Sequence, residues 1–324
     1  MIPSARRARP RALPGILVTG GIRMIADAPF RLETCACPLC DEPPPEKARA
    51  LFPPYRVVDC DSCSMRYLSP RVHEDDVARL YSTPEYWEEG GSEGGYSSYS
   101  SMEPLLVRTF VRRISLLPQR AAGARLLDVG CGPGAGLEAA RSLGYDAWGL
   151  DVSSPAVAVA SSRHPDRVRL GILSDRLFPQ GFFDVITLFD VIEHVYDPRR
   201  LAVDLAWHLA PEGRILVATP NVKSLLARAT GRRWVSYKIP EHVSYFSPRT
   251  LAAALAPGFE IEHVSSCGQY VSLDFLLRRI GDALPFGGSS LRAAAGLFRP
   301  GGAAAALYAN SGSMLVTARR SRAA

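Results

Sequence analysis

The stretch LLDVGCGPGAGLEAA, residues 126–140, decides the fold of this 324-residue chain. An apolar run from Leu126 to Val129 leads into a loop that is almost bare of side chains, and a segment with the apolar spacing of a helix follows at once. A loop of this kind turns sharply and brings backbone N–H groups and a helix N-terminus close to a ligand. The sequence therefore predicts a ligand-binding turn between a strand and a helix of an α/β sheet.

Short apolar runs alternate with helical segments from Arg125 onward. Runs of this length, separated by helices, are typical of strands that are buried on both faces of a doubly wound parallel sheet. The runs are RLLDVG, DAWGLDVS, VRLGIL, FDVITLFDVI, GRILVATPN, FEIEHVSSCG and SMLVTARR. We therefore predict an α/β, Rossmann-like fold. An apolar, arginine-dotted segment at about 270–310 interrupts the last two strands, and we interpret it as a helical insertion that caps the site or packs as a dimer face.

The end of the second predicted strand carries an acidic residue, Asp151, nineteen positions after Gly132. An acidic side chain at this place is expected to hold the ribose hydroxyls of a nucleoside. The glycine spacing alone also suits a dinucleotide, because Ala135 is an allowed substitute for the third glycine of that fingerprint. The spacing of the loop leaves the cofactor open.

Three segments, LLDVGCGPG, GLDVS and FFDVITLFDVIEHVYDP, together resemble the signatures of class I S-adenosylmethionine-dependent methyltransferases. The resemblance implies a seven-stranded sheet whose last strand, SMLVTARR, is antiparallel. It also implies that Asp128 lies near the methionine amino group, that the loop backbone passes under the adenosyl group, and that Asp175 lies near the adenine. The loop positions concerned are Gly130, Cys131, Gly132 and Gly134. Phe189 and Asp190 end the fourth strand, and ligands collect at the carboxyl edge of an open α/β sheet, so we expect both at the cofactor pocket.

Two Cys-x-x-Cys pairs, Cys37 with Cys40 and Cys60 with Cys63, lie in a short, proline-rich segment at 35–69. Four thiolates complete a tetrahedral zinc shell with no open position, so we predict a structural rather than a catalytic zinc ion. Two disulfides are the alternative, and a reducing cytoplasm disfavours them. We interpret Cys131 and Cys267 as packed thiols rather than metal ligands.

The cysteine segment and the block EHVSYFSPRTL, at 241–251, resemble bacterial sugar C-methyltransferases over about 35–250. In those enzymes the Glu-His pair lies at the acceptor site, and the histidine is associated with proton removal. The resemblance therefore implies catalytic roles for Glu241 and His242, with His194 as a second candidate and Tyr96 in a loop that closes over the cofactor. Those enzymes carry a further C-terminal domain, and we expect no counterpart of it in this sequence, so the methylated atom, O, C or N, stays open.

The ends of the chain differ from its body. The formal net charge is +6. Four arginines lie within the first twelve residues and three within the last seven, and these seven positive charges account for more than the whole net charge. The body is therefore near neutral, and an extended nucleic-acid surface is not indicated. We interpret 1–34 as a disordered basic tail, 70–122 as a helical connector with the cofactor flap, and 123–324 as the catalytic domain. We expect no transmembrane segment and a cytoplasmic location, with peripheral membrane contact left open.

These patterns favour an S-adenosylmethionine-dependent methyltransferase that acts on a small molecule, a sugar or a lipid-linked glycan. Three alternatives remain at this stage. The zinc module would serve RNA binding in an RNA methyltransferase, the fold would bind cofactor without turnover in a non-catalytic protein, or the loop would hold NAD in a dehydrogenase.

Overall fold

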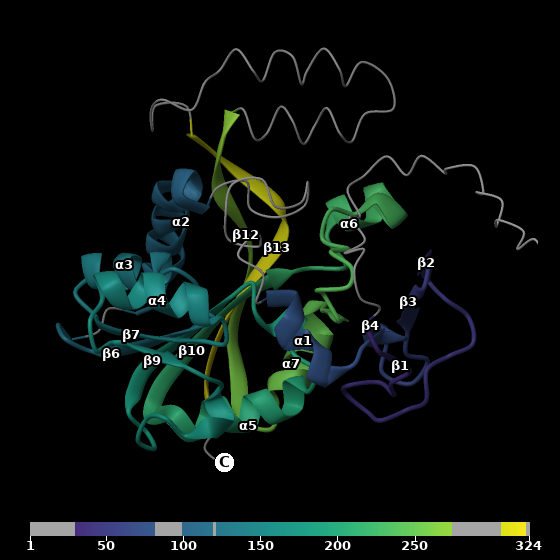
Figure 1. Cartoon of the computed structure of the whole chain (residues 1–324), viewed down its shortest axis with the longest axis horizontal. Helices are drawn as coiled ribbons and strands as arrows, with labels where there is room; N and C mark the ends of the chain where they lie inside the picture. Colours follow the sequence, from purple (N-terminus) through teal and green to yellow (C-terminus); the bar gives the residue numbers. More distant parts are fainter. Residues whose placement is uncertain (1–29, 82–98, 119–120, 274–305, 322–324) are drawn as a thin grey trace, which may run out of the picture.

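The computed structural model describes residues 30–81, 99–118, 121–273 and 306–321. Its largest element is a seven-stranded sheet in the order β12-β13-β10-β9-β6-β7-β8 (Figure 1). The neighbours from β10 to β8 are parallel, while β13 is antiparallel to both β10 and β12. The predicted Rossmann-like sheet with one antiparallel strand is confirmed.

All seven apolar runs form the strands of this sheet. Their bounds are β6 (Arg125–Val129), β7 (Asp146–Asp151), β8 (Val168–Leu170), β9 (Phe183–Phe189), β10 (Leu209–Pro220), β12 (Phe259–Ser272) and β13 (Ala306–Arg320). The central strands are buried on both faces, which explains why they read as continuous apolar runs rather than as alternating ones.

Helices cover both faces of the sheet (Figure 1). One face carries α2 (Tyr99–Ile114), α3 (Ala135–Ser142) and α4 (Ser154–Arg163), and the other carries α5 (Pro198–His208) and α7 (Pro248–Leu255). Two apolar clusters, one on each side, fill the space between helices and sheet. Proline at the first turn and a hydroxyl or carboxylate cap start three of these helices, at Ser153, Asp197 and Ser247.

The cysteine segment forms a small body beside the large sheet (Figure 1). It contains β2 (Ala50–Phe52), β3 (Tyr55–Asp59) and β4 (Arg66–Leu68), with β1 (Leu32–Glu33) paired to β5 (Arg71–Val72). A fourth strand, β11 (Ser244–Tyr245), joins β4 from far along the chain, so the order is β11-β4-β3-β2. The Glu-His block is therefore built into the sheet of the cysteine segment.

The remaining described elements are α1 (Glu74–Tyr81), α6 (Leu225–Thr230) and three short 3-10 turns, η2 (Leu173–Asp175), η3 (Ile192–His194) and η4 (Gly231–Arg233). Within the segment interpreted as an insertion, β12 continues to Ser272 and β13 begins at Ala306, while 274–305 lie outside the described residues. The tail up to residue 29 and the flap at 82–98 also lie outside them. Among the helices described, none has the length and apolar character needed to cross a membrane.

Candidate active site

The glycine loop joins β6 to α3 at the carboxyl edge of the sheet. Gly130 is exposed and has φ +69, and a Cβ there would lie 2.6 Å from Cγ2 of Val191. Gly132 and Gly134 also have positive φ, at 52° and 107°. Only glycine adopts this conformation without strain, and the exposed Gly130 leaves bare backbone where a ligand can approach. Cys131 follows with its thiol buried against Gly149.

Asp151 ties the loop to the neighbouring strand. Its carboxylate accepts the N–H of Gly132 at 2.8 Å and the N–H of Ser153 at 2.8 Å. Burial raises its pKa, although these backbone N–H bonds lower it again. Each carboxylate oxygen keeps further acceptor capacity, so Asp151 can both shape the loop and accept hydroxyl hydrogens.

Asp128 lies under the loop and is 3% exposed. One oxygen accepts the hydroxyl of Thr187 at 2.7 Å, and the other lies 2.0 Å from where a Cβ on Gly136 would stand. Burial raises its pKa to about 7, and nearby Asp151 adds to this rise. Gly136 is therefore required by the close approach of α3 to a buried carboxyl group.

The end of β9 brings together a carboxylate and a guanidinium. Asp190 has a left-handed φ of 57° and is partly exposed, and Phe189 stacks on Phe110 of α2 with ring centroids 4.8 Å apart. Nη1 of Arg113, also on α2, lies 3.6 Å from Oδ2 of Asp190. Arg113 is 3% exposed, and its Nε and Nη1 have no hydrogen-bond partner. A buried guanidinium with unused donors is costly unless a ligand completes it.

Sequence reasoning missed Arg113. It lies among other arginines on an amphipathic helix, VRTFVRRI, where each arginine reads as a solvated charge. Nothing in the pattern separates it from Arg112, whose guanidinium instead lies 4.5 Å from the ring of Tyr308.

Two histidines meet beside this edge. The rings of His194 on η3 and His242 are 4.6 Å apart and nearly perpendicular. Nδ1 of His194 lies 3.0 Å from the carbonyl of Glu241, which the nitrogen reaches as a donor. The structure thus brings all three predicted catalytic residues together, although the carboxyl group of Glu241 is not the part that contacts His194.

Glu193 completes the group and was also missed by sequence reasoning. It is 1% exposed, its Oε2 accepts the hydroxyl of Thr219 at 2.9 Å, and its Oε1 has no partner. One ligand atom from each of Glu193, His194 and His242 lies within 4.8 Å of the others. One feature of the sequence could have indicated Glu193: it directly precedes His194 and follows the end of the fourth predicted strand.

Burial sets the charge state of this group. It lowers the pKa of His194 to about 4, with Lys238 adding to the effect, and lowers that of His242 well below its usual value. Burial and the nearby Asp190 raise the pKa of Glu193 to about 8, and burial also raises that of Glu241. Both imidazoles are therefore neutral near pH 7.

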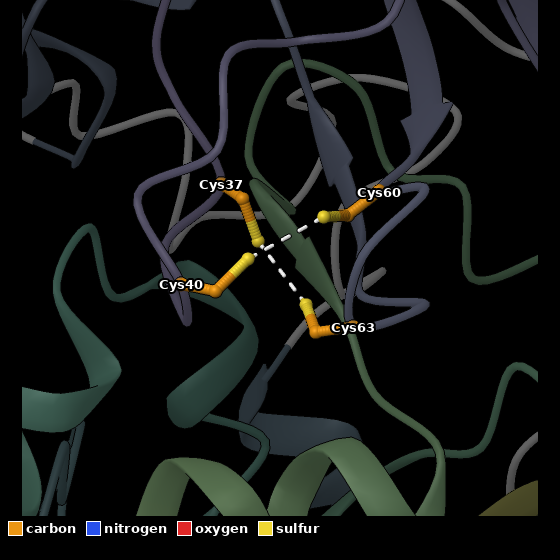
Figure 2. Close-up of side chains that lie close together, drawn as sticks. All are labelled: Cys37, Cys40, Cys60 and Cys63. Carbon is orange, nitrogen blue, oxygen red and sulfur yellow. Dashed lines mark hydrogen bonds between the residues drawn. The ribbon is translucent and has the colours of Figure 1, made fainter.

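The four predicted metal ligands converge from two loops (Figure 2). Sγ of Cys37 lies 3.4 Å from Sγ of Cys63, and Sγ of Cys40 lies 3.5 Å from Sγ of Cys60. Sulfurs at ~2.3 Å from a tetrahedral ion are about 3.8 Å apart, so the cluster fits one ion after a small expansion. None of the seven cysteines, all of them in the described part of the chain, forms a disulfide.

The two loops have the same hydrogen bonds. In the first, the N–H of Cys37 donates to Glu42 and the N–H of Asp41 donates to Cys37. In the second, Cys60 donates to Met65 and Ser64 donates to Cys60. The residue after each second cysteine has a left-handed φ, 60° at Asp41 and 65° at Ser64. Two matching turns present their thiols to one point.

Two further site residues were predicted from the sequence, Asp175 and Tyr96. Asp175 is exposed on η2, and its carboxylate accepts the N–H of Ile172 at 2.9 Å, which closes the turn after β8. Tyr96 lies outside the described residues.

Comparison with known proteins assigns the chain to a protein family. A family model described as a methyltransferase domain matches residues 102–264, half of the chain. The chain belongs to the methyltransferase domain family. The predicted class I methyltransferase fold and the prediction of an S-adenosylmethionine-dependent enzyme are confirmed.

Curated relatives of this methyltransferase include two O-methyltransferases of ubiquinone biosynthesis. The protein of Thiobacillus denitrificans is 28% identical over 207 residues, which are 60% of this chain and 86% of that protein. The protein of a Caulobacter species is 32% identical over 146 residues, or 41% and 58% of the two chains. Among solved structures, the complex of the Haloferax volcanii Trm112 methyltransferase activator with the putative methyltransferase matches with a TM-score of 0.50. That match is 19% identical, covers 67% of this chain and 91% of the other, and shows the fold alone.

Proposed function

We propose that this methyltransferase transfers a methyl group from S-adenosylmethionine to an O, C or N atom of a small-molecule, sugar or lipid-linked acceptor. The observation that supports this most is the convergence of the glycine loop, the Asp190–Arg113 pair and the histidine pair at one edge of the sheet. Its curated relatives act in ubiquinone biosynthesis as O-methyltransferases, which favours a hydroxyl group on a small molecule as the acceptor.

The cofactor end of the site fits a zwitterionic nucleoside. Asp151 offers carboxylate oxygens that can accept ribose hydroxyls, and the exposed backbone at Gly130 allows the adenosyl group to approach closely. Asp190 and Arg113 offer a carboxylate beside a guanidinium with unused donors, which complements the ammonium and carboxylate of an amino acid. When bound, S-adenosylmethionine supplies an electrophilic methyl group on a sulfonium.

The acceptor end needs alignment and, for a hydroxyl or a carbon acid, removal of a proton. We assign proton removal to His242, with His194 as the second candidate, because both are neutral and lie beside the end of β9. Nδ1 of His242 has no hydrogen-bond partner and is available as an acceptor. The carbonyl of Glu241 holds the ring of His194 in place.

The cysteine cluster supports a structural zinc ion. Four thiolates leave no open coordination position, and the segment is too short to fold around a core of its own. An ion at this place would fix β3 and β4, and through them β11 and the Glu-His block.

A thermal-shift titration tests the cofactor assignment. S-adenosylhomocysteine should raise the melting temperature of the purified protein, and NADH should not. A panel of phenols, sugars and lipid-linked sugars with radiolabelled S-adenosylmethionine then tests the acceptor class. Stabilisation by NADH alone would contradict the proposal, and labelling of total RNA would favour the RNA alternative.

A further inference from the structure

Glu193, His194 and His242 form a second cluster with metal-ligand chemistry, 130 residues or more along the chain from the four cysteines. We propose that these three side chains bind a divalent transition-metal ion at the acceptor end of the site. The proposal rests on the proposed function and keeps these residues at the acceptor end, but it makes His242 a metal ligand in place of the base assigned above. Its test measures metal binding and therefore does not depend on the identity of the acceptor.

The donor set is one carboxylate and two imidazoles. This set is typical of catalytic zinc sites and of open iron sites, which keep free positions for water or substrate. Metal–ligand distances of about 2.0–2.2 Å place neighbouring donors roughly 3–3.6 Å apart around one ion. The three donor atoms already lie within 4.8 Å of one another, so small side-chain rotations suffice.

Two donor atoms are buried and unpaired. Oε1 of Glu193 and Nδ1 of His242 have no hydrogen-bond partner, and the two residues are 1% and 3% exposed. Leaving both atoms without a partner in the interior costs free energy. A cation between them would satisfy both at once.

The surroundings orient the donors as in known metal sites. His194 donates its Nδ1 hydrogen to the carbonyl of Glu241, which leaves Nε2 as the ring atom with a lone pair. The other oxygen of Glu193 is held by Thr219. A hydrogen bond on one atom of a ligand residue fixes which other atom faces the metal.

Lys238 acts against the site, because its charge disfavours a cation at all three residues. A bound ion displaces the proton of Glu193, so the loaded cluster has one carboxylate, two neutral imidazoles and a net positive charge. Removal of the Lys238 charge should therefore tighten metal binding.

An ion here would act on the acceptor directly. A coordinated hydroxyl loses its proton to solvent more readily, because the cation stabilises the resulting oxyanion. The oxyanion then forms the new O–C bond, the S–C electron pair returns to sulfur, and the products are a methyl ether, S-adenosylhomocysteine and a proton. A metal ion would occupy the lone pair on Nδ1 of His242. That nitrogen could then not accept a proton from the acceptor, so His242 is either a metal ligand or a general base.

Titration with Mn²⁺ tests the site while the thiolate cluster holds zinc. Manganese prefers oxygen and nitrogen donors, whereas the four thiolates select zinc. The protein is loaded with one equivalent of zinc, and free Mn²⁺ is followed by electron paramagnetic resonance. We expect one Mn²⁺ per chain, binding at least about tenfold weaker in Glu193→Gln, and tighter binding in Lys238→Met.

Glu260→Gln is the matched control, since Glu260 is an exposed carboxylate paired with Arg319 on the far strands, and it should bind like the wild type. Crystals of the wild-type protein soaked in Mn²⁺ keep the test valid if Glu193→Gln does not fold. An anomalous peak between the three side chains supports the site. No binding, equal binding in Glu193→Gln, or a peak elsewhere would overturn it.

Discussion

Tyr67 of β4 pairs with Ser244 of β11. The β3–β4 hairpin, whose loop holds Cys60 and Cys63, is therefore hydrogen-bonded to the Glu-His block. The N–H of Leu68 donates to the carbonyl of Val243, and the N–H of Val243 donates to the carbonyl of Glu193. A continuous path of backbone hydrogen bonds thus runs from the cysteine cluster to the histidine pair. The cysteine segment therefore forms one wall beside the histidine pair, where we propose that the acceptor binds.

Loss of zinc should loosen this wall and leave the cofactor loop intact. Cys60→Ser removes one thiolate and should free β4 and β11, because we propose that a zinc ion holds the segment in its fold. We expect faster hydrogen exchange at 242–246 and little change at 126–140. Binding of S-adenosylhomocysteine should stay within about threefold of wild type, while acceptor turnover falls more than about tenfold.

Cys35→Ser is the control for that experiment. Cys35 lies outside the four-thiol cluster, and its thiol donates to the carbonyl of Leu68, a bond that a hydroxyl also makes. It should retain zinc and the wild-type exchange pattern. Equal exchange at 242–246 in both variants would contradict a supporting role for the ion.

The sequence predicted the parts of the fold that are local. The central strands β6 and β9 were readable because each is a continuous apolar run, and the glycine loop because its bare residues adjoin a strand and a helix. The pairing of β4 with β11 was not readable, since almost 180 residues separate Tyr67 from Ser244 and a two-residue strand has no period. Arg113 and Glu193 were missed because charged residues read as solvated until their burial is known.

Gly136 should be intolerant of even one added methyl group. Gly136→Ala would place a Cβ 2.0 Å from Oδ2 of Asp128, so α3 or the carboxyl group must move. We expect a loss of about 1–3 kcal/mol in the free energy of unfolding, measured in urea. Gly123 has a φ of +79° and open space around it. Gly123→Ala therefore measures only the free-energy cost of a left-handed backbone at a residue with a side chain, about 1–2 kcal/mol. An unchanged free energy of unfolding in Gly136→Ala would show that α3 does not approach Asp128 this closely.

Arg113 should contribute to cofactor affinity rather than to stability. Arg113→Met keeps an apolar chain packed against the rings of Phe110 and Phe189 but removes the unused donors. We expect S-adenosylhomocysteine to bind about tenfold more weakly by calorimetry, since a charge-assisted hydrogen bond is lost. The melting temperature without ligand should change little, because removal of the unpaired buried donors offsets loss of the contact with Asp190 and of the bond to the carbonyl of Gly268. Unchanged affinity would remove Arg113 from the cofactor site.

Asp128 should make the stability of the ligand-free protein depend on pH. Its folded pKa of about 7 lies above the unfolded value, so folding favours the protonated form. That stabilisation is complete below about pH 4 and is lost as the pH rises toward 7. Asp128→Asn keeps an acceptor for Thr187 and cannot ionise, so its free energy of unfolding should fall less between pH 5 and pH 8 than that of the wild type. Urea unfolding at both pH values measures the difference, which at full burial is no more than about 4 kcal/mol. Parallel pH profiles of the two proteins would show that burial does not raise the pKa of Asp128.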